Sequence, residues 1–90
     1  MDVTKIPSIE FDIYPNPASD FANLSLNMES ERDVSISVLN AIGQEVFYSN
    51  DTYKSGVNSV KIDLNGLEAG VYFYIVASEN FSNTKRLVVK

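Results

Sequence analysis

Hydrophobic and polar residues alternate with a period of two along most of this chain. Leu24, Leu26 and Met28 occupy alternate positions and are separated by polar side chains. The same pattern recurs at residues 34–38 and 60–64. Because successive side chains of a β-strand point to opposite faces, this alternation predicts strands that bury one face and expose the other.

The segment 71–77 differs from the other runs because both sets of its alternate positions are apolar. Its odd-numbered positions hold valine, phenylalanine, isoleucine and alanine, and its even-numbered positions hold two tyrosines and a valine. A strand with two apolar faces is typical of a buried, central position in a sheet. We therefore expect this segment to have a neighbouring strand on each side.

Turn-forming residues separate these runs. Pro15-Asn16-Pro17 cannot continue a strand, because two of its three positions lack an N–H donor. Residues 40–43 are typical of a hairpin turn in which Gly43 adopts a positive φ. Ser55-Gly56 and Asn65-Gly66 mark further breaks.

These signals together predict an all-β chain. The seven predicted strands cover residues 9–14, 21–28, 34–40, 44–49, 57–64, 70–78 and 81–89. A helical turn is expected only at residues 65–69. Seven short strands joined by polar turns favour an antiparallel β-sandwich.

Composition limits the organisation and the partners of the chain. Ninety residues suffice for one domain, and 44% of them are hydrophobic, as in an ordinary folded domain. No run of about 18 apolar residues occurs, so direct membrane insertion is not expected. A net charge of −5 argues against nucleic acid as a partner.

Positive charge is concentrated in the last six residues. Residues 85–90 contain Lys85, Arg86 and Lys90 and no acidic residue, whereas residues 1–84 contain four basic and twelve acidic residues. One interpretation is a charged final strand that resists edge-to-edge pairing with another chain. The other is a segment presented to a partner. The residues alone leave both open.

The side chains available for chemistry predict a protein that is not an enzyme. The chain lacks histidine and cysteine, and with them the commonest nucleophile–base pairs, disulfides and preferred zinc ligands. Carboxylates such as Asp20 and Asp63 have no context that marks a catalytic pair. Asp63-Leu64-Asn65 offers too few oxygen ligands for calcium and is better explained as a turn. We expect no metal and no cofactor.

Five tyrosines raise one alternative, a carbohydrate-binding or adhesive module. Tyr72 and Tyr74 fall on one face of a strand and could together form a platform on which sugar rings stack. Aromatic residues also suit the core of a small sandwich, and packing in the core is the competing interpretation. A passive spacer domain of a secreted enzyme is a further alternative.

The order of strands and turns supports a more specific assignment. The motifs, in sequence order, lie at residues 13–17, 34–40, 43–46, 56–58, 62–64, 67–72 and 84–90. Together they closely resemble the C-terminal sorting domain of the type IX secretion system of Bacteroidetes, the type A sorting domain. Arg86 stands where a second lysine is frequent, and Asn40 where aspartate is frequent. The resemblance covers residues 13–90 and leaves residues 1–12 as a linker or domain edge.

This resemblance implies a fold and a function. The implied fold is an immunoglobulin-like sandwich. The implied function is a non-catalytic secretion signal, which directs an N-terminal cargo from the periplasm of a Gram-negative bacterium through the outer-membrane translocon to the cell surface or the medium. A sortase-like protease removes the domain in many members.

The resemblance also suggests two groups of site residues. The chain end, with alternating apolar and basic groups, is expected to act as an edge strand that pairs with a receptor strand. The predicted recognition residues are Lys85, Arg86, Leu87, Val88, Val89 and Lys90. The predicted fold-maintaining residues are Pro15, Asn16, Pro17, Gly43, Gly56, Gly70, Val71 and Tyr72.

Overall fold

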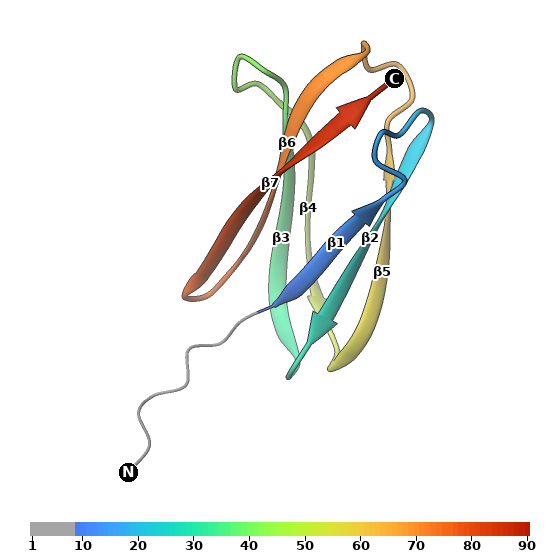
Figure 1. Cartoon of the computed structure of the whole chain (residues 1–90). Coiled ribbons are helices and arrows are strands. Elements are labelled where there is room, and N and C mark those ends of the chain that lie inside the picture. The colour runs from blue at the N-terminus through green and yellow to red at the C-terminus, as the bar shows by residue number, and fades with distance from the viewer. Residues whose placement is uncertain (1–8) are drawn as a thin grey trace.

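The computed structural model describes residues 9–90, and these form seven strands without a helix. The strands are β1 (Glu10–Tyr14), β2 (Phe21–Met28), β3 (Arg32–Leu39), β4 (Glu45–Tyr53), β5 (Gly56–Asp63), β6 (Gly70–Ser78) and β7 (Phe81–Val89). One sheet has the order β1-β2-β5 and the other the order β4-β3-β6-β7, and every pair of neighbouring strands is antiparallel. The two sheets face each other (Figure 1). The predicted all-β, immunoglobulin-like sandwich is confirmed.

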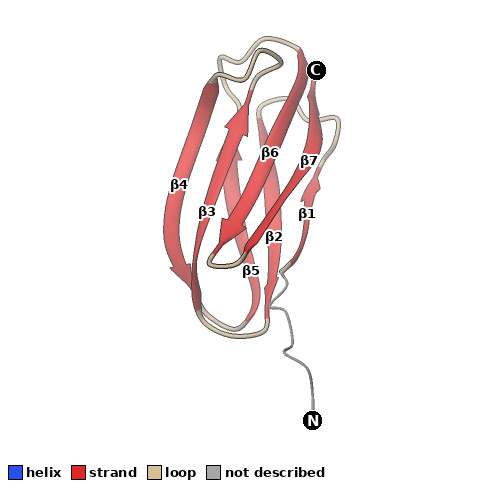
Figure 2. Cartoon of the chain, turned by 90° about the vertical axis from the view of Figure 1, so that its left-hand side faces the viewer, coloured by secondary structure: helices blue, strands red, loops and turns tan. Residues whose placement is uncertain are grey.

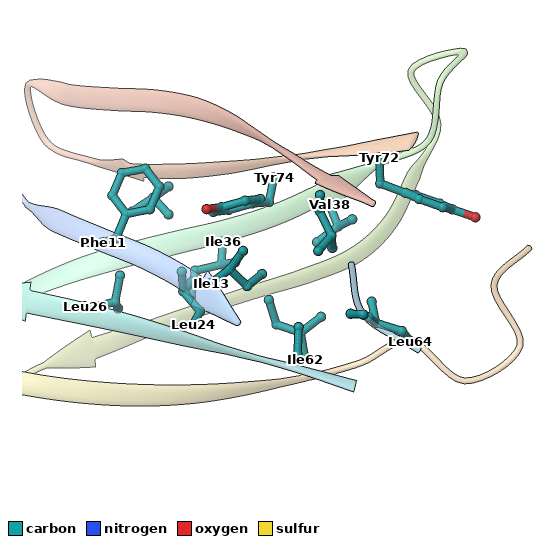
Figure 3. Packing of buried hydrophobic residues seen from close by; sticks show 14 of the residues in the cluster. Phe11, Ile13, Leu24, Leu26, Ile36, Val38, Ile62, Leu64, Tyr72 and Tyr74 are labelled. Carbon is teal, nitrogen blue, oxygen red and sulfur yellow. The ribbon is translucent and has the colours of Figure 1, made fainter. Parts of the chain in front are cut away.

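The core lies between the sheets and follows the alternation seen in the sequence. Leu24 and Leu26 of β2 face Ile36 and Val38 of β3, and all four side chains are 0% exposed (Figure 3). No polar or charged residue among residues 9–90 belongs to the buried class. Since apolar burial is the dominant favourable term in folding, this single core accounts for most of the favourable free energy of the fold.

β6 occupies the central position that its two apolar faces predict. It pairs with β3 on one side and with β7 on the other. Its inward side chains are Tyr72, Tyr74 and Val76, which are all buried. The ring of Phe11 in β1 meets the Tyr74 ring edge-on at a centroid distance of 5.8 Å, so aromatic contacts connect the two sheets.

One strand boundary differs by more than two residues from the one expected. β4 continues to Tyr53 instead of ending at residue 49, because its polar residues pair with the early part of β3. Arg32 pairs with Tyr53, and Asp33 pairs with Thr52. An edge strand exposes much of its surface, so polar side chains there do not indicate a break.

The expected helical turn at residues 65–69 is absent. The backbone nitrogen of Leu67 donates to the carbonyl of Leu64, and the Asp63 carboxylate accepts a hydrogen bond from the backbone nitrogen of Asn65 at 2.9 Å. These bonds form a tight turn between β5 and β6. The alternative explanation of Asp63-Leu64-Asn65 as a turn is therefore confirmed.

The packed domain begins before residue 13. Ile9 and Phe11 belong to the core, with exposed fractions of 6% and 7%. A domain start at Ile13 would divide β1. The rest of the segment expected to be a linker or domain edge, residues 1–8, lies outside the described residues.

Candidate functional site

The final strand, which contains most of the predicted recognition residues, is an integral part of the sandwich. β7 pairs with β6 along its whole length, from Phe81 opposite Ser78 to Val89 opposite Gly70. The side chains of Leu87 and Val89 are 0% and 2% exposed. Two of the six residues predicted to recognise a receptor therefore face the core.

The segment after β1 covers the outer edge of β7. The Asn16 carboxamide accepts a hydrogen bond from the Val88 backbone nitrogen at 3.0 Å and donates one to the Arg86 carbonyl at 3.1 Å. Ala18 donates to the Val88 carbonyl at 2.8 Å and accepts from the Lys90 nitrogen at 2.7 Å, which forms a parallel bridge opposite Val89. The backbone groups at this end of β7 are therefore already paired.

The remainder of the β7 edge carries no such cover. Backbone groups of alternate residues in an antiparallel strand point away from its partner, and those of Val88 do so here. By the same alternation, Ser82 and Thr84 turn their N–H and C=O groups outward. No backbone hydrogen bond connects these two residues to any other described segment. A receptor strand could pair here directly, but pairing beyond Arg86 would require displacement of Asn16 and Ala18.

Lys85 connects β7 to the other sheet through its side chain. Its Nζ donates a hydrogen bond to the Phe11 carbonyl at 2.8 Å and lies 4.5 Å from the centroid of the Phe11 ring. Phe11 belongs to β1, so this contact joins the edge strands of the two sheets. A lysine at this position thus has a structural explanation, which the sequence did not suggest.

The remaining three predicted recognition residues lie on the outside. Arg86 and Lys90 are exposed, and Val88 is half-buried. Arg86 and Val88 alternate with the buried Leu87, so they lie on the outer face of the sheet, and Lys90 follows at the next position of this alternation. The chain end therefore presents two cations that flank one apolar side chain.

Among the residues predicted to maintain the fold, the first group forms the loop that covers β7. Pro15 and Pro17 are exposed, and both follow cis peptide bonds. Asn16, between them, makes the two hydrogen bonds to β7. Ala18, which was not predicted, is 1% exposed and makes the adjoining backbone bridge. An alanine after a proline gives no signal of this role in the sequence.

The second group lies at turns and at the ends of strands. Gly43 has φ of 88°, and the Asn40 side chain accepts hydrogen bonds from the nitrogens of Ile42 and Gln44 in the same turn. Gly56 opens β5 and Gly70 opens β6. These are the places where turn chemistry is required.

The third group, Val71 and Tyr72, points to opposite faces of β6. Tyr72 is 7% exposed, and its hydroxyl donates to the Glu68 carbonyl at 2.7 Å, so it fixes the turn before β6. Val71 is 41% exposed on the outer face.

The tyrosines do not form a sugar-binding platform. Tyr72 and Tyr74 are buried between the sheets, so neither ring can stack on a ligand. Burial and the negative charge of Asp12 raise the pKa of the Tyr74 phenol to about 12. Tyr14 and Tyr48 are exposed but belong to different sheets. Packing in the core is therefore the correct interpretation of the Tyr72–Tyr74 pair.

No metal cluster occurs in the described part of the chain, and a depression with charged walls lies at Glu31, Arg32, Asp33 and Glu79. No group of three or more aspartate or glutamate side chains among residues 9–90 could hold a metal ion. A second open depression lies between the turn at residues 40–42 and residues 66–72, and Glu68 is its only charged lining residue. The described residues also contain no helix that is long and apolar enough to cross a membrane.

Comparison with protein families gives a match over nearly the whole chain. The family model described as the secretion system C-terminal sorting domain matches residues 12–90. This range includes all of β2 to β7 and most of β1. A search of curated proteins finds no match.

Comparison with solved structures shows where this fold occurs. Dimeric latent PorU from Porphyromonas gingivalis contains a similar domain, with 20% identity and a TM-score of 0.76 over 99% of this chain. A β-glucosidase from Listeria innocua in complex with glucose contains a more distant one, with 10% identity and a TM-score of 0.55 over 92% of this chain. This chain spans 10% of the PorU chain and 16% of the β-glucosidase chain. At these identities the likeness concerns the fold alone.

Proposed function

Because this chain belongs to the family of secretion system C-terminal sorting domains, we propose that it directs an N-terminal cargo through the type IX outer-membrane export machinery. The observation that carries this proposal is the family match over residues 12–90. The fold shared with a domain of PorU supports it. The domain acts as a folded secretion signal and has no catalytic role of its own.

The outward side chains of the chain end make the contact with the translocon. Arg86, Val88 and Lys90 are accessible, and they combine charge with an apolar contact. Charged groups of this kind steer an encounter and fix its orientation. Lys85, Leu87 and Val89 contribute indirectly, because they hold the strand that carries the contact residues.

A sortase-like protease then removes the domain on the N-terminal side of β1. Ile9 and Phe11 are packed in the core, so a cut within β1 would require the sandwich to open first. The cargo, once released from the domain, is located at the cell surface or in the medium, after passage through the periplasm.

A reporter fusion tests the proposed function. The whole chain is joined to the C-terminus of a folded reporter that carries its own periplasmic signal peptide, in a host with a working type IX system. We expect the reporter at the surface or in the medium, and in the periplasm of a matched host that lacks the translocon. Retention of the reporter in the periplasm of both hosts would reject the proposal.

Substitutions serve this test better than a deletion of the chain end. Removing residues 87–90 would take two buried side chains from the core and would break the bonds to Asn16 and Ala18. A failure of export would then reflect unfolding as readily as loss of a contact. The informative changes are at the exposed residues Arg86 and Lys90.

A further inference from the structure

The outer face of the four-stranded sheet is apolar where β6 meets its neighbours. Figure 2 views this sheet with β6 and β7 toward the reader. Val71 and Phe73 of β6 are 41% and 38% exposed. The next outward residue of β6, Ile75, is half-buried and also apolar. β6 therefore turns apolar side chains to both of its faces, and only the inner set contributes to the core.

The flanking strands extend this apolar area. Leu39 of β3 lies opposite Phe73 on one side, and Val88 of β7 lies opposite Val71 on the other. Cross-strand partners have Cβ atoms about 4.5–5.5 Å apart, so these side chains form one continuous surface. We call it the apolar outer face; its apolar residues are Leu39, Val71, Phe73, Ile75 and Val88, and Arg86 lies opposite Phe73 beside them.

The outer face of the other sheet shows that this apolar area is not required by the fold. Its middle strand, β2, turns Asn23, Ser25 and Asn27 outward, and β1 turns Glu10 and Asp12 outward. The exposed apolar side chains of this face, Tyr14, Phe21 and Val57, each lie opposite a polar residue in the register. A largely polar outer face is the usual arrangement in an antiparallel sheet with one solvated side.

The apolar outer face also differs in charge from the rest of the acidic domain. β6 and β7 contain no acidic residue, in a chain whose net charge is −5. Arg86 lies opposite Phe73 in the register, and Lys90 follows Val89 at the same end of the sheet. Arg86 forms no ion pair with any residue in the described part of the chain. Its charge is therefore available to an external carboxylate.

We propose that the apolar outer face is the surface that docks onto the export machinery, against an apolar protein surface rimmed by carboxylates. The proposal rests on the proposed secretion function and adds the residues of β3 and β6 to the contact. Phe73 provides the central apolar anchor, and Arg86 pairs with the carboxylate rim. Aromatic and arginine side chains are the residues that most often dominate binding at protein interfaces.

Charge favours this partner over the two other possible occupants. A second copy of the chain would bring Arg86 and Lys90 of one molecule toward those of the other, and like charges oppose such pairing. An anionic membrane would repel a chain with a net charge of −5. A protein surface can place its carboxylates opposite Arg86 and Lys90 alone, away from the acidic residues of the rest of the domain, so it meets neither obstacle.

The opposite sheet provides a matched control for the test. Phe21 is 40% exposed on the outer face of β2, and Lys61 Nζ lies 4.7 Å from its ring centroid. The double variant Phe73→Thr/Arg86→Glu and the control Phe21→Thr/Lys61→Glu therefore remove equivalent groups and change the net charge equally. Both are placed in the reporter fusion, and their melting temperatures are compared.

We expect the exported fraction to fall by about tenfold in the Phe73→Thr/Arg86→Glu fusion and to stay at the wild-type level in the control. Equal export of the two variants would overturn the proposal. If the first variant melts markedly below the control, Arg86→Glu alone is compared with Lys54→Glu, an exposed residue of the β4–β5 turn. If export falls in Arg86→Glu but not in Lys54→Glu, the proposal is supported. Equal export of the two variants overturns it.

Three further measurements test whether another partner occupies the apolar outer face and whether the secretion function itself holds. Sedimentation of the wild-type domain as a dimer that Phe73→Thr dissociates would identify a second copy as the occupant and overturn the proposal. Binding to vesicles of an anionic phospholipid that Arg86→Glu abolishes would overturn it in favour of a membrane. If the wild-type fusion itself remains in the periplasm, the secretion function is rejected and the docking proposal with it.

Discussion

Lys85 and Phe11 join the two sheets at their edges, since the lysine donates to the Phe11 carbonyl at 2.8 Å while its charge lies over the Phe11 ring. The contact spans 74 positions of sequence. It gives a residue of the charged chain end a role in the stability of the fold.

The first prediction concerns this contact. We expect Lys85→Met, which keeps the apolar stem and removes the ammonium, to lower the free energy of unfolding by about 1 kcal/mol. Urea denaturation measures the change. Lys90→Met is the matched control, because the Lys90 side chain makes no hydrogen bond to a described residue, and its effect should stay within about 0.5 kcal/mol. Equal effects of the two variants would contradict the structural role of Lys85.

The second prediction concerns the cover of the β7 edge. Asn16→Ala removes the acceptor for the Val88 nitrogen and the donor to the Arg86 carbonyl. We expect a loss of about 1 kcal/mol, because both backbone groups are exposed and can bond to water instead. Asn16→Asp keeps the acceptor alone and should fall between wild type and Asn16→Ala. Hydrogen exchange of the Val88 amide should be faster in Asn16→Ala, and an unchanged exchange rate would argue against this bond.

The third prediction separates the two faces of β7. Leu87 is fully buried, so Leu87→Ala should cost about 2–5 kcal/mol, a large part of the roughly 5–10 kcal/mol available to a small domain. Val88→Ala, on the outer face, should cost clearly less. Denaturation midpoints of the two variants provide the measurement. A similar midpoint for both would mean that Leu87 is not packed as described.

The fourth prediction concerns pH. The pKa of the Tyr74 phenol is raised from its ordinary value of 10.0 to about 12 in the folded state, by burial first and by Asp12 second. Between these two values the unfolded chain releases the proton that the folded chain keeps. The contribution to stability is thus complete below pH 10 and is lost as the pH rises toward 12.

The free energy of unfolding, measured by denaturation, should therefore be lower at pH 11 than at pH 8. In Tyr74→Phe this difference should be smaller. Burial and the charge of Asp51 also raise the pKa of Tyr53, so part of the decrease should remain in that variant. An identical pH dependence of wild type and Tyr74→Phe would show that Tyr74 does not titrate differently in the two states.

The strands were predictable because alternation and turn residues agree along most of the chain. Leu24, Leu26 and Met28 face the core as their spacing predicts, and Gly43 lies in the predicted turn. β4 was underestimated because its polar residues after Tyr48 resemble a break, and only the pairing with β3 decides otherwise.

The candidate site was less predictable because it depends on contacts between distant segments. The alternation in β7 divides its residues between core and surface, but no local signal links Lys85 with Phe11 or Asn16 with Val88. Phe73 was assigned to a strand with two apolar faces, without an indication of which face would be covered. The answer follows from the sandwich, which has a sheet on only one side of β6.

The bridge between Ala18 and Val89 has a consequence for synthesis. A ribosome releases the N-terminal half of the sandwich well before the residues that close it, so Ala18 must wait for a partner about 70 positions later in the chain. Leu87 and Val89 complete the core only after they have left the exit tunnel. A nascent chain interrupted before this point lacks the end of β7 and the two core side chains that it contributes. The complete sandwich therefore forms only after these residues have been translated.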